Sequence, residues 1–314
     1  MKISNIYYTI LNKPFFIDLR RIDAQAVLID KLLDRDIAEF TSEKLSDSKP
    51  MGIEVVTVLN QTTPSPSYSG GESKTVLSDF NKAPEGSVAV VQLRGDMMKE
   101  GTMCSYGTEE IAAVIREAAS SKKIIGIRLD IDSGGGAVDA IAPMLDAIRY
   151  SQSLGKPVVA CCDLCASAAY YVACHCDEII ADNDISAEFG SIGVMIQFPD
   201  YAKYYEKNGV KIHTIYSDLS THKNAPFEAA LKGDYKSIKE ETLNPLAREF
   251  QAAVRSHRKN LDEKVEGILN GRMFFARDAV KNGLIDAVGS KQMATEEVRQ
   301  LSAQMSLQSY VASL

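Results

Sequence analysis

The chain has 314 residues, of which 45% are hydrophobic and 25% charged, and this composition excludes a disordered, collagen-like or disulfide-scaffold protein. Its 35 Lys and Arg residues against 42 Asp and Glu residues give a formal net charge of -7, which argues against nucleic acid or an anionic membrane as a partner. The length suits two domains, or one large α/β domain with appendages.

Charged residues interrupt the first 21 positions, so the N-terminal region lacks the continuous apolar core of a signal peptide. The most hydrophobic window, residues 158–176, contains Asp163 and is predicted to be a buried strand followed by a buried helix. We therefore expect a cytoplasmic protein without a membrane anchor. In that compartment the six cysteines are expected to be reduced thiols.

Composition along the chain predicts four regions. Residues 1–58 are expected to form a small N-terminal segment that includes an amphipathic helix. Residues 59–86 include a run rich in Pro, Ser, Thr and Gly and are predicted to be a flexible linker. Residues 87–290 alternate short β-branched runs with helical patterns, which is typical of βαβ units and a largely parallel sheet. Residues 291–314 are predicted to be a C-terminal helical tail.

Within the main region the elements are expected in a regular alternation. Strands are predicted over 88–93, 124–131, 157–162, 178–181, 192–198 and 210–216. Helices are predicted to begin at Thr108, near Ala166 and at Tyr201, and a long polar helix is predicted over 234–259 with a break at Pro245.

A glycine run follows the predicted strand 124–131 and is expected to be a tight loop, Ser133-Gly134-Gly135-Gly136. Parallel sheets bind ligands where their strands end, and consecutive glycines let the backbone approach a ligand and present N–H groups to an anion. The spacing matches neither a mononucleotide nor a dinucleotide motif. A triple glycine on its own is more commonly a tight turn than an oxyanion hole.

A serine, Ser167, lies among small residues at the predicted start of the helix near Ala166. This position suits a nucleophile, because the N–H of Ala168 would join that of Gly135 in holding a developing oxyanion. A lone serine at a helix start is usually an N-cap or a packing residue. A catalytic role also requires a base.

Two kinds of base are open to Ser167. His175 lies eight residues further along the same predicted helix and would point away from it, so a core or surface histidine is the simpler interpretation. Lys223 follows the predicted strand 210–216 in a loop that contains Pro226. A lysine can act as a base when desolvation lowers its pKa, but without a partner Lys223 would be a surface lysine.

Five features between residues 87 and 289 occur in the order found in one peptidase family. They are 131–138 (IDSGGGAV), 166–173 (ASAAYYVA), 190–194 (GSIGV), Lys223, and Gly271-Arg272 with Ala279 and 283–286 (GLID). The chain thereby resembles the S49 serine peptidases, which include signal peptide peptidase A and phage head-maturation proteases, within the ClpP/crotonase superfamily. It departs from the family where Ala168 and Ala169 replace two glycines and Gly134 replaces a proline.

The resemblance implies an α/β fold of the ClpP/crotonase type, a stacked ββα superhelix with a parallel sheet. It implies a Ser/Lys dyad of Ser167 and Lys223 and no metal or organic cofactor. It also implies an oxyanion site formed by Gly135 and Ala168. The implied substrate-binding site consists of Gly136, Ser191, Ile192 and Gly193.

The family further implies a protein or peptide substrate in a flexible or unfolded segment. It implies a homo-oligomeric ring, in which the N-terminal segment serves assembly or gating. The expected setting is the cytoplasm, as for a soluble signal-peptide-peptidase-like protease, or a phage prohead during head maturation.

Three alternatives stay open. The pairs Cys162/Cys165 and Cys174/Cys176 would supply four zinc ligands, although packing cysteines are favoured because their predicted strand and helix positions diverge. A protein of the same fold without peptidase activity, either a crotonase-like acyl-CoA enzyme or an inactive assembly or peptide-binding protein, would have no use for a Ser/Lys pair. A ClpP-type triad is disfavoured, because the window 191–193, about 25 residues after the serine, contains no histidine.

Overall fold

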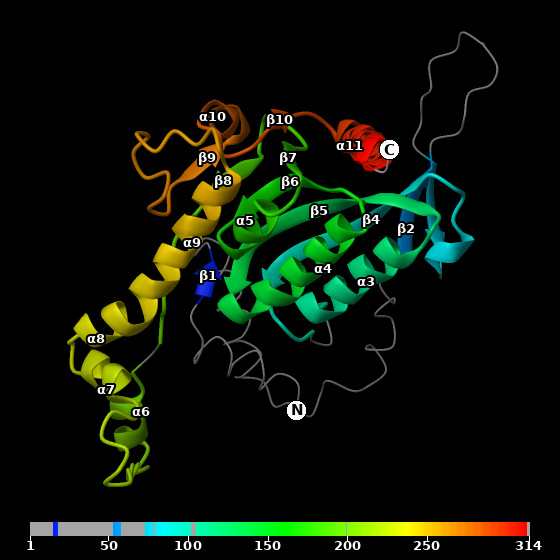
Figure 1. Ribbon diagram of the computed structural model, residues 1–314. Helices are drawn as coiled ribbons and strands as arrows, with labels where there is room; N and C mark the ends of the chain where they lie inside the picture. Colours follow the sequence, from blue (N-terminus) through cyan, green and yellow to red (C-terminus); the bar gives the residue numbers. More distant parts are fainter. Residues whose placement is uncertain are drawn as a thin grey trace, which may run out of the picture.

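The computed structural model describes residues 15–17, 53–57, 73–77, 79–101, 105–198 and 200–312. Their centre is a largely parallel sheet with the strand order β10-β7-β6-β5-β4-β2-β3 (Figure 1). The parallel part consists of β4 (Ser87–Met97), β5 (Ile124–Ala137), β6 (Val158–Ala166), β7 (Glu178–Ala181) and β10 (Ala287–Val288). This sheet confirms the predicted parallel α/β class.

Antiparallel strands extend the sheet at several places. β2 (Ile53–Thr57) pairs with β4 and with β3 (Ser73–Leu77). β1 (Phe15–Ile17) pairs with the end of β5. β8 (Glu188–Gly190) runs parallel to the end of β6 and antiparallel to β9 (Met273–Phe275). The sheet therefore begins before residue 87, and β3 lies inside the range predicted to be a linker. The predicted N-terminal helix lies outside the described residues.

Helices cover both faces of the sheet and form one projecting arm (Figure 1). The covering helices are α3 (Thr108–Ser120), α4 (Ile141–Ser153), α5 (Ala168–Ala173), α10 (Ala276–Lys281) and α11 (Lys291–Ala312). The arm is formed by α6 (Ala202–Lys207), α7 (Ala225–Leu231), α8 (Lys236–Ile238), the π-helical turn Lys239–Leu243 and α9 (Asn244–His257). Short 3-10 helices lie at Phe80–Lys82 and Val138–Ala140. None of the helices in the described ranges is long and apolar enough to cross a membrane.

The core divides between the two faces of the sheet. Side chains that alternate along β4, β6 and β7, such as Val88, Cys161 and Ile180, pack against Ala294 and Val298 of α11. The side chains on the other face of the sheet pack against α3, α4 and α5 and form the larger of the two hydrophobic clusters. Both faces of the central strands are buried, which is the reason that their sequences are continuous apolar runs.

Three sequence expectations about the strands are wrong. The glycine run is not a tight loop: β5 continues to Ala137, because β4 continues beside it as far as Met97. The ranges 192–198 and 210–216 are not strands. Ile212 and Ile215 of the second range are 63% and 91% exposed, so this β-branched run has no neighbouring strand against which to pack.

A buried ion pair joins β5 to α11. The guanidinium of Arg128 is fully buried and donates to both carboxylate oxygens of Asp130, at 2.7 and 3.2 Å. It also donates to the carbonyl of Lys291 and to Oγ1 of Thr295, at 3.0 and 2.6 Å. These bonds satisfy the buried charge and fix the start of α11 against the sheet.

Replacing Asp130 with alanine is expected to lower the free energy of unfolding by about 3–5 kcal/mol, because it leaves the charge of Arg128 buried without its partner. Urea unfolding measures this change. Asp146→Ala on the exposed face of α4 is the control and is expected to have little effect. A change at Asp130 as small as that of the control would contradict the assigned role of the ion pair.

Candidate active site

Ser167 forms the sharp turn between β6 and α5. Its φ of 55° and ψ of -119° lie in a region that L-residues rarely adopt, and the residue is only 1% exposed. Such a conformation costs on the order of 1–3 kcal/mol and persists only when the surrounding structure holds it. Here the backbone N–H of Ser167 donates to the carbonyl of Gly190 at 2.9 Å, and its carbonyl accepts from the N–H of Tyr171 at 2.9 Å.

A second strained serine lies next to this turn. Ser191 has a φ of 53°, and among the described residues only Ser167, Ser191 and Asn224 combine a side chain with a positive φ. The pairing of Ala166 with Gly190 makes the two serines neighbours on adjacent strands. Ser191 is held in turn by a bond from its N–H to the carbonyl of Arg272 at 3.1 Å. Strained residues that cluster in this way are typical of functional sites.

The hydroxyl of Ser167 has no role in capping α5. Its side chain makes no capping hydrogen bond with the first turn of the helix, and its backbone lacks the extended conformation of an N-cap. The N-cap interpretation of this serine is therefore wrong. A serine held at a strained strand-to-helix turn is instead the arrangement in which serine hydrolases present a nucleophile.

The end of β5 lies beside the strand that leads to Ser167. Ser133 pairs with Cys165, the last β6 residue that pairs with β5, and Gly135 and Ser167 each follow that pair by two residues. Gly135 has a φ of 100°, which favours glycine. Its N–H donates to Oγ of Ser133 at 3.1 Å, so the predicted oxyanion donor is bonded within its own strand in this structure.

Close packing explains the next glycine. A Cβ atom at Gly136 would lie 2.0 Å from the carbonyl oxygen of Met97 in β4, so no larger residue fits there. On its other edge Gly136 pairs with Phe16 of β1.

The other predicted oxyanion and substrate residues surround the same turn. Ala168 is fully buried at the first position of α5, where a backbone N–H has no acceptor within the helix. Ser191, Ile192 and Gly193 directly follow β8, and of these Ile192 is fully buried. The structure therefore gathers these residues with Ser167 at the ends of β5, β6 and β8.

Lys223 lies elsewhere. It is exposed in the turn before α7, where its backbone N–H donates to the carbonyl of Ser220 at 3.0 Å. This turn belongs to the arm, which projects from the body that contains α5 (Figure 1). Within one chain, the structure does not bring Lys223 to Ser167.

The closing segment 283–286 supports the helix that begins after Ser167. Tyr170 is fully buried in the core and donates from its hydroxyl to the carbonyl of Leu284 at 2.7 Å. Asp286 accepts from the N–H of Ile179 and from Arg258, each at 2.8 Å. The sequence had not singled out Arg258, whose only local signal is its position at the end of the long polar helix.

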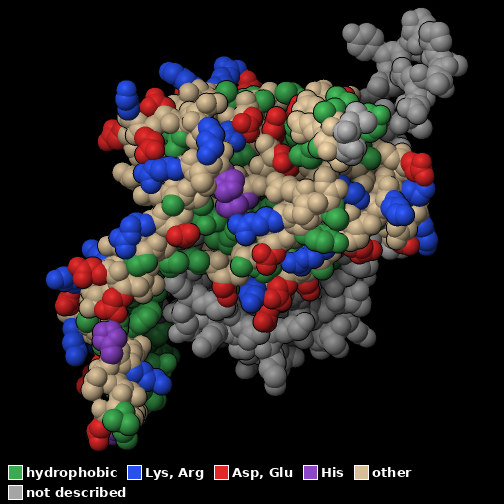
Figure 2. Space-filling model, viewed as in Figure 1, with side chains coloured by type: hydrophobic (Ala, Val, Ile, Leu, Met, Phe, Trp, Pro, Cys, Tyr) green, Lys and Arg blue, Asp and Glu red, His purple; other side chains and the backbone are tan. Residues whose placement is uncertain are grey.

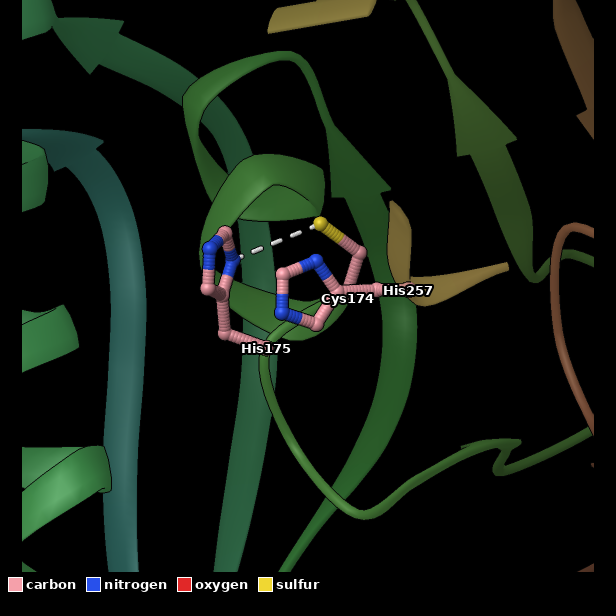
Figure 3. A group of neighbouring side chains, drawn as sticks. All are labelled: Cys174, His175 and His257. Atoms are coloured by element: carbon pink, nitrogen blue, oxygen red, sulfur yellow. Dashed lines mark hydrogen bonds between the residues drawn. The ribbon is translucent and has the colours of Figure 1, made fainter. Parts of the chain in front are cut away.

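A cysteine and two histidines form a cluster at the far end of α5 (Figure 3). The donor atoms of Cys174, His175 and His257 lie within 4.8 Å of one another. Each of these side chains already forms a hydrogen bond with a backbone carbonyl. Cys174 and His175 both bond to the carbonyl of Tyr171, at 3.0 and 2.8 Å, and His257 bonds to the carbonyl of Ala253 at 2.8 Å. Burial raises the pKa of the Cys174 thiol to about 12, in agreement with a neutral thiol that donates to a backbone carbonyl. Packing therefore accounts for this cluster.

The buried imidazole of His175 predicts acid sensitivity. Burial lowers its pKa to about 4, against about 6.5 in an unfolded chain. Because the folded state favours neutral His175, its contribution to stability is complete above about pH 6.5 and falls as the pH drops toward 4. Between pH 7.5 and 4.5 the melting temperature of His175→Gln is expected to fall less than that of the wild type. The control His213→Gln, at an exposed histidine, is expected to show the same fall as the wild type. Equal losses in all three proteins would contradict this assignment.

The fold and the strained turn thus define a parallel α/β protein with the nucleophile geometry of a serine hydrolase. The family model "Peptidase family S49" matches residues 151–305. Protease 4 of Haemophilus influenzae is 26% identical over 218 residues, covering 68% of this chain and 34% of that protein. Head-tail preconnector protein GP5 of Enterobacteria phage P21 is 29% identical over 181 residues, covering 57% and 35%. Residues 151–305 of the chain therefore match peptidase family S49, the family that the motifs predicted.

This chain spans about a third of the length of these two relatives. Among solved structures, the 1510-N membrane-bound stomatin-specific protease matches with 15% sequence identity and a TM-score of 0.40. The match covers 67% of this chain and 82% of the chain of that protease.

Proposed function

We propose that this chain is a serine endopeptidase in which Ser167 is the nucleophile. The observation that carries the proposal is the strained turn between β6 and α5, which holds a serine without using its hydroxyl for capping. A fold gains nothing in stability from a non-glycine residue at this φ, so the strain is best explained by the need to present Oγ.

The reaction follows the acyl-enzyme route. A neutral Lys223 takes the proton of Ser167 as Oγ attacks the scissile carbonyl carbon, and the N–H groups of Gly135 and Ala168 hold the oxyanion. Gly135 must then exchange its bond with Ser133 for one to the oxyanion. The leaving amine takes the proton from Lys223, and water activated by the same lysine releases the acid. This route uses neither a metal nor an organic cofactor.

Lys223 is assigned to the Ser167 of a neighbouring copy in a homo-oligomeric ring. It is exposed on the projecting arm, whereas a lysine that acts as a general base has to be desolvated. Figure 2 shows hydrophobic side chains on the surface of the arm. Ile215 and Leu219, between α6 and α7, are 91% and 96% exposed. Packing of the arm against a second copy would cover these side chains and desolvate Lys223.

The proposed substrates are flexible or unfolded protein segments, because an extended peptide fits the strand ends that surround Ser167. Gly136, Ser191, Ile192 and Gly193 are assigned to substrate binding at these ends. Similarity to a phage head-tail preconnector protein and to a bacterial Protease 4 supports two settings, phage or prophage head maturation and cytoplasmic signal-peptide-peptidase-like proteolysis.

The test is cleavage of casein by the wild type, Ser167→Ala and Lys223→Ala, with fluorophosphonate labelling of each protein. Cleavage and labelling by the wild type, with loss of cleavage in both variants, is the expected result. A wild-type protein that neither cleaves nor reacts would favour an inactive assembly or peptide-binding protein of the same fold.

A further inference from the structure

The end of β5 has an edge that its own sheet leaves open. On one side β5 pairs with β4 as far as Met97, opposite Gly136. On the other side it pairs with β6 only as far as Cys165, opposite Ser133, because β6 then turns at Ser167 into α5. β6 therefore leaves residues 134–137 without a strand partner on the side where Ser167 lies, and such an edge accepts a further strand.

The chain itself supplies that strand. β1 pairs antiparallel with β5, with Phe15 opposite Ala137, Phe16 opposite Gly136 and Ile17 opposite Gly135. Because β4 already occupies the other edge at Gly135 and Gly136, β1 must lie on the edge that β6 leaves. Its contact with α5 agrees with this placement, and Figure 1 shows β1 beside the end of β5 and below α5.

The pairing register brings Ile17 toward the turn that contains the nucleophile. Ile17 lies opposite Gly135, two residues beyond Ser133, and Ser167 follows Cys165, the β6 partner of Ser133, by the same two residues. The antiparallel direction means that the chain runs from Phe15 toward Ile17 as it approaches this turn. β1 thus lies along β5 in the way expected for the part of a peptide substrate that precedes the scissile bond. Ile17 is the last residue of this part.

We propose that β1 is an internal substrate and that Ser167 cuts the backbone of its own chain on the carboxyl side of Ile17. The inference rests on the proposed peptidase function. Oγ of Ser167 bonds to the carbonyl carbon of Ile17 and gives its proton to the base. The C–N bond to Asp18 then breaks, and the nitrogen of Asp18 takes that proton. Water hydrolyses the ester and leaves a carboxylate at Ile17, a free amine at Asp18 and Oγ protonated again.

Cleavage changes what the site can bind. While β1 lies on β5, the open edge at residues 134–137 is filled, and no other peptide can pair there. Hydrolysis converts β1 into a product strand that ends at Ile17 and is no longer joined to the rest of the chain. Its departure frees the edge for other substrates, so self-cleavage is the step that opens the site.

The experiment follows the intact mass and the N-terminal sequence of the purified full chain, carrying a C-terminal tag, and measures casein cleavage in the same samples. The wild type is expected to lose all residues before Asp18, and Ser167→Ala to retain its full mass. Two variants, Phe16→Pro and Ile17→Pro, each remove one backbone N–H from β1. The N–H groups of consecutive strand residues point to opposite sides, so only one of these two variants loses a hydrogen bond to β5. That variant is expected to cleave itself at least about tenfold more slowly, whereas Asn5→Pro, outside β1, matches the wild type.

Each other result overturns the proposal in a distinct way. A wild type that cleaves casein but keeps its full mass, or cuts itself outside β1, contradicts the internal substrate and leaves the peptidase function intact. A wild type that cleaves neither casein nor itself contradicts both. A Ser167→Ala chain of distinct mass is expected to stay intact when mixed with the wild type, and its cleavage would contradict pairing within one chain. Melting temperatures of all variants show whether each is folded.

Discussion

Ser167→Ala is expected to lower kcat/KM for casein by a factor of roughly 10⁴ or more, because a serine peptidase without its nucleophile retains only the contribution of binding and oxyanion stabilisation. The free energy of unfolding is expected to stay within about 1 kcal/mol of the wild type, since the hydroxyl makes no capping bond with α5. Casein kinetics and urea unfolding on the same preparations measure the two quantities.

Ser167→Gly separates strain from chemistry. Glycine adopts a positive φ without steric cost, so this variant is expected to be inactive and yet at least as stable as Ser167→Ala, by up to about 1 kcal/mol. Ser153→Ala, an exposed serine at the end of α4, is the control for both activity and stability. Retention of activity by Ser167→Ala would move the nucleophile to another residue, whereas a large loss of stability would assign Ser167 a structural role.

Lys223→Ala is expected to be as inactive as Ser167→Ala, and an equal mixture of the two inactive variants is expected to recover activity. If the base comes from a neighbouring copy, a site that combines Ser167 of one variant with Lys223 of the other is complete. Random assortment in a ring makes about one quarter of the sites complete. Mixing after mild dissociation and reassembly, followed by casein cleavage, measures this recovery.

The controls for this experiment lie on the same arm. Lys232→Ala removes an exposed lysine directly after α7 and is expected to retain wild-type activity. If the assembled mixture stays inactive, Lys223 does not act across copies. If Lys223→Ala alone cleaves casein, Lys223 is not the base.

Local patterns in the sequence predicted a large part of the fold. The helix start at Thr108 was predictable because Glu110 follows in its first turn, and its carboxylate accepts from the N–H of Gly107 at 2.8 Å. The continuous apolar runs of β4 to β7 were predictable because strands buried on both faces contain few polar residues. Where a local pattern had no partner, as at residues 210–216, the same reasoning predicted a strand that does not form.

The sequence alone determined which residues have the chemistry: a serine among small residues, a glycine run after a buried strand, and the ordered motifs of an S49 peptidase. Tertiary structure decided how they are used. Pairing between distant segments holds Ser167 in its strained turn, extends β5 through the glycines and places β1 beside them. It also places the turn before α7, which contains Lys223, on the arm that projects away from α5. Spacing and capping act over a few residues, whereas strand register and burial depend on which distant segments become neighbours.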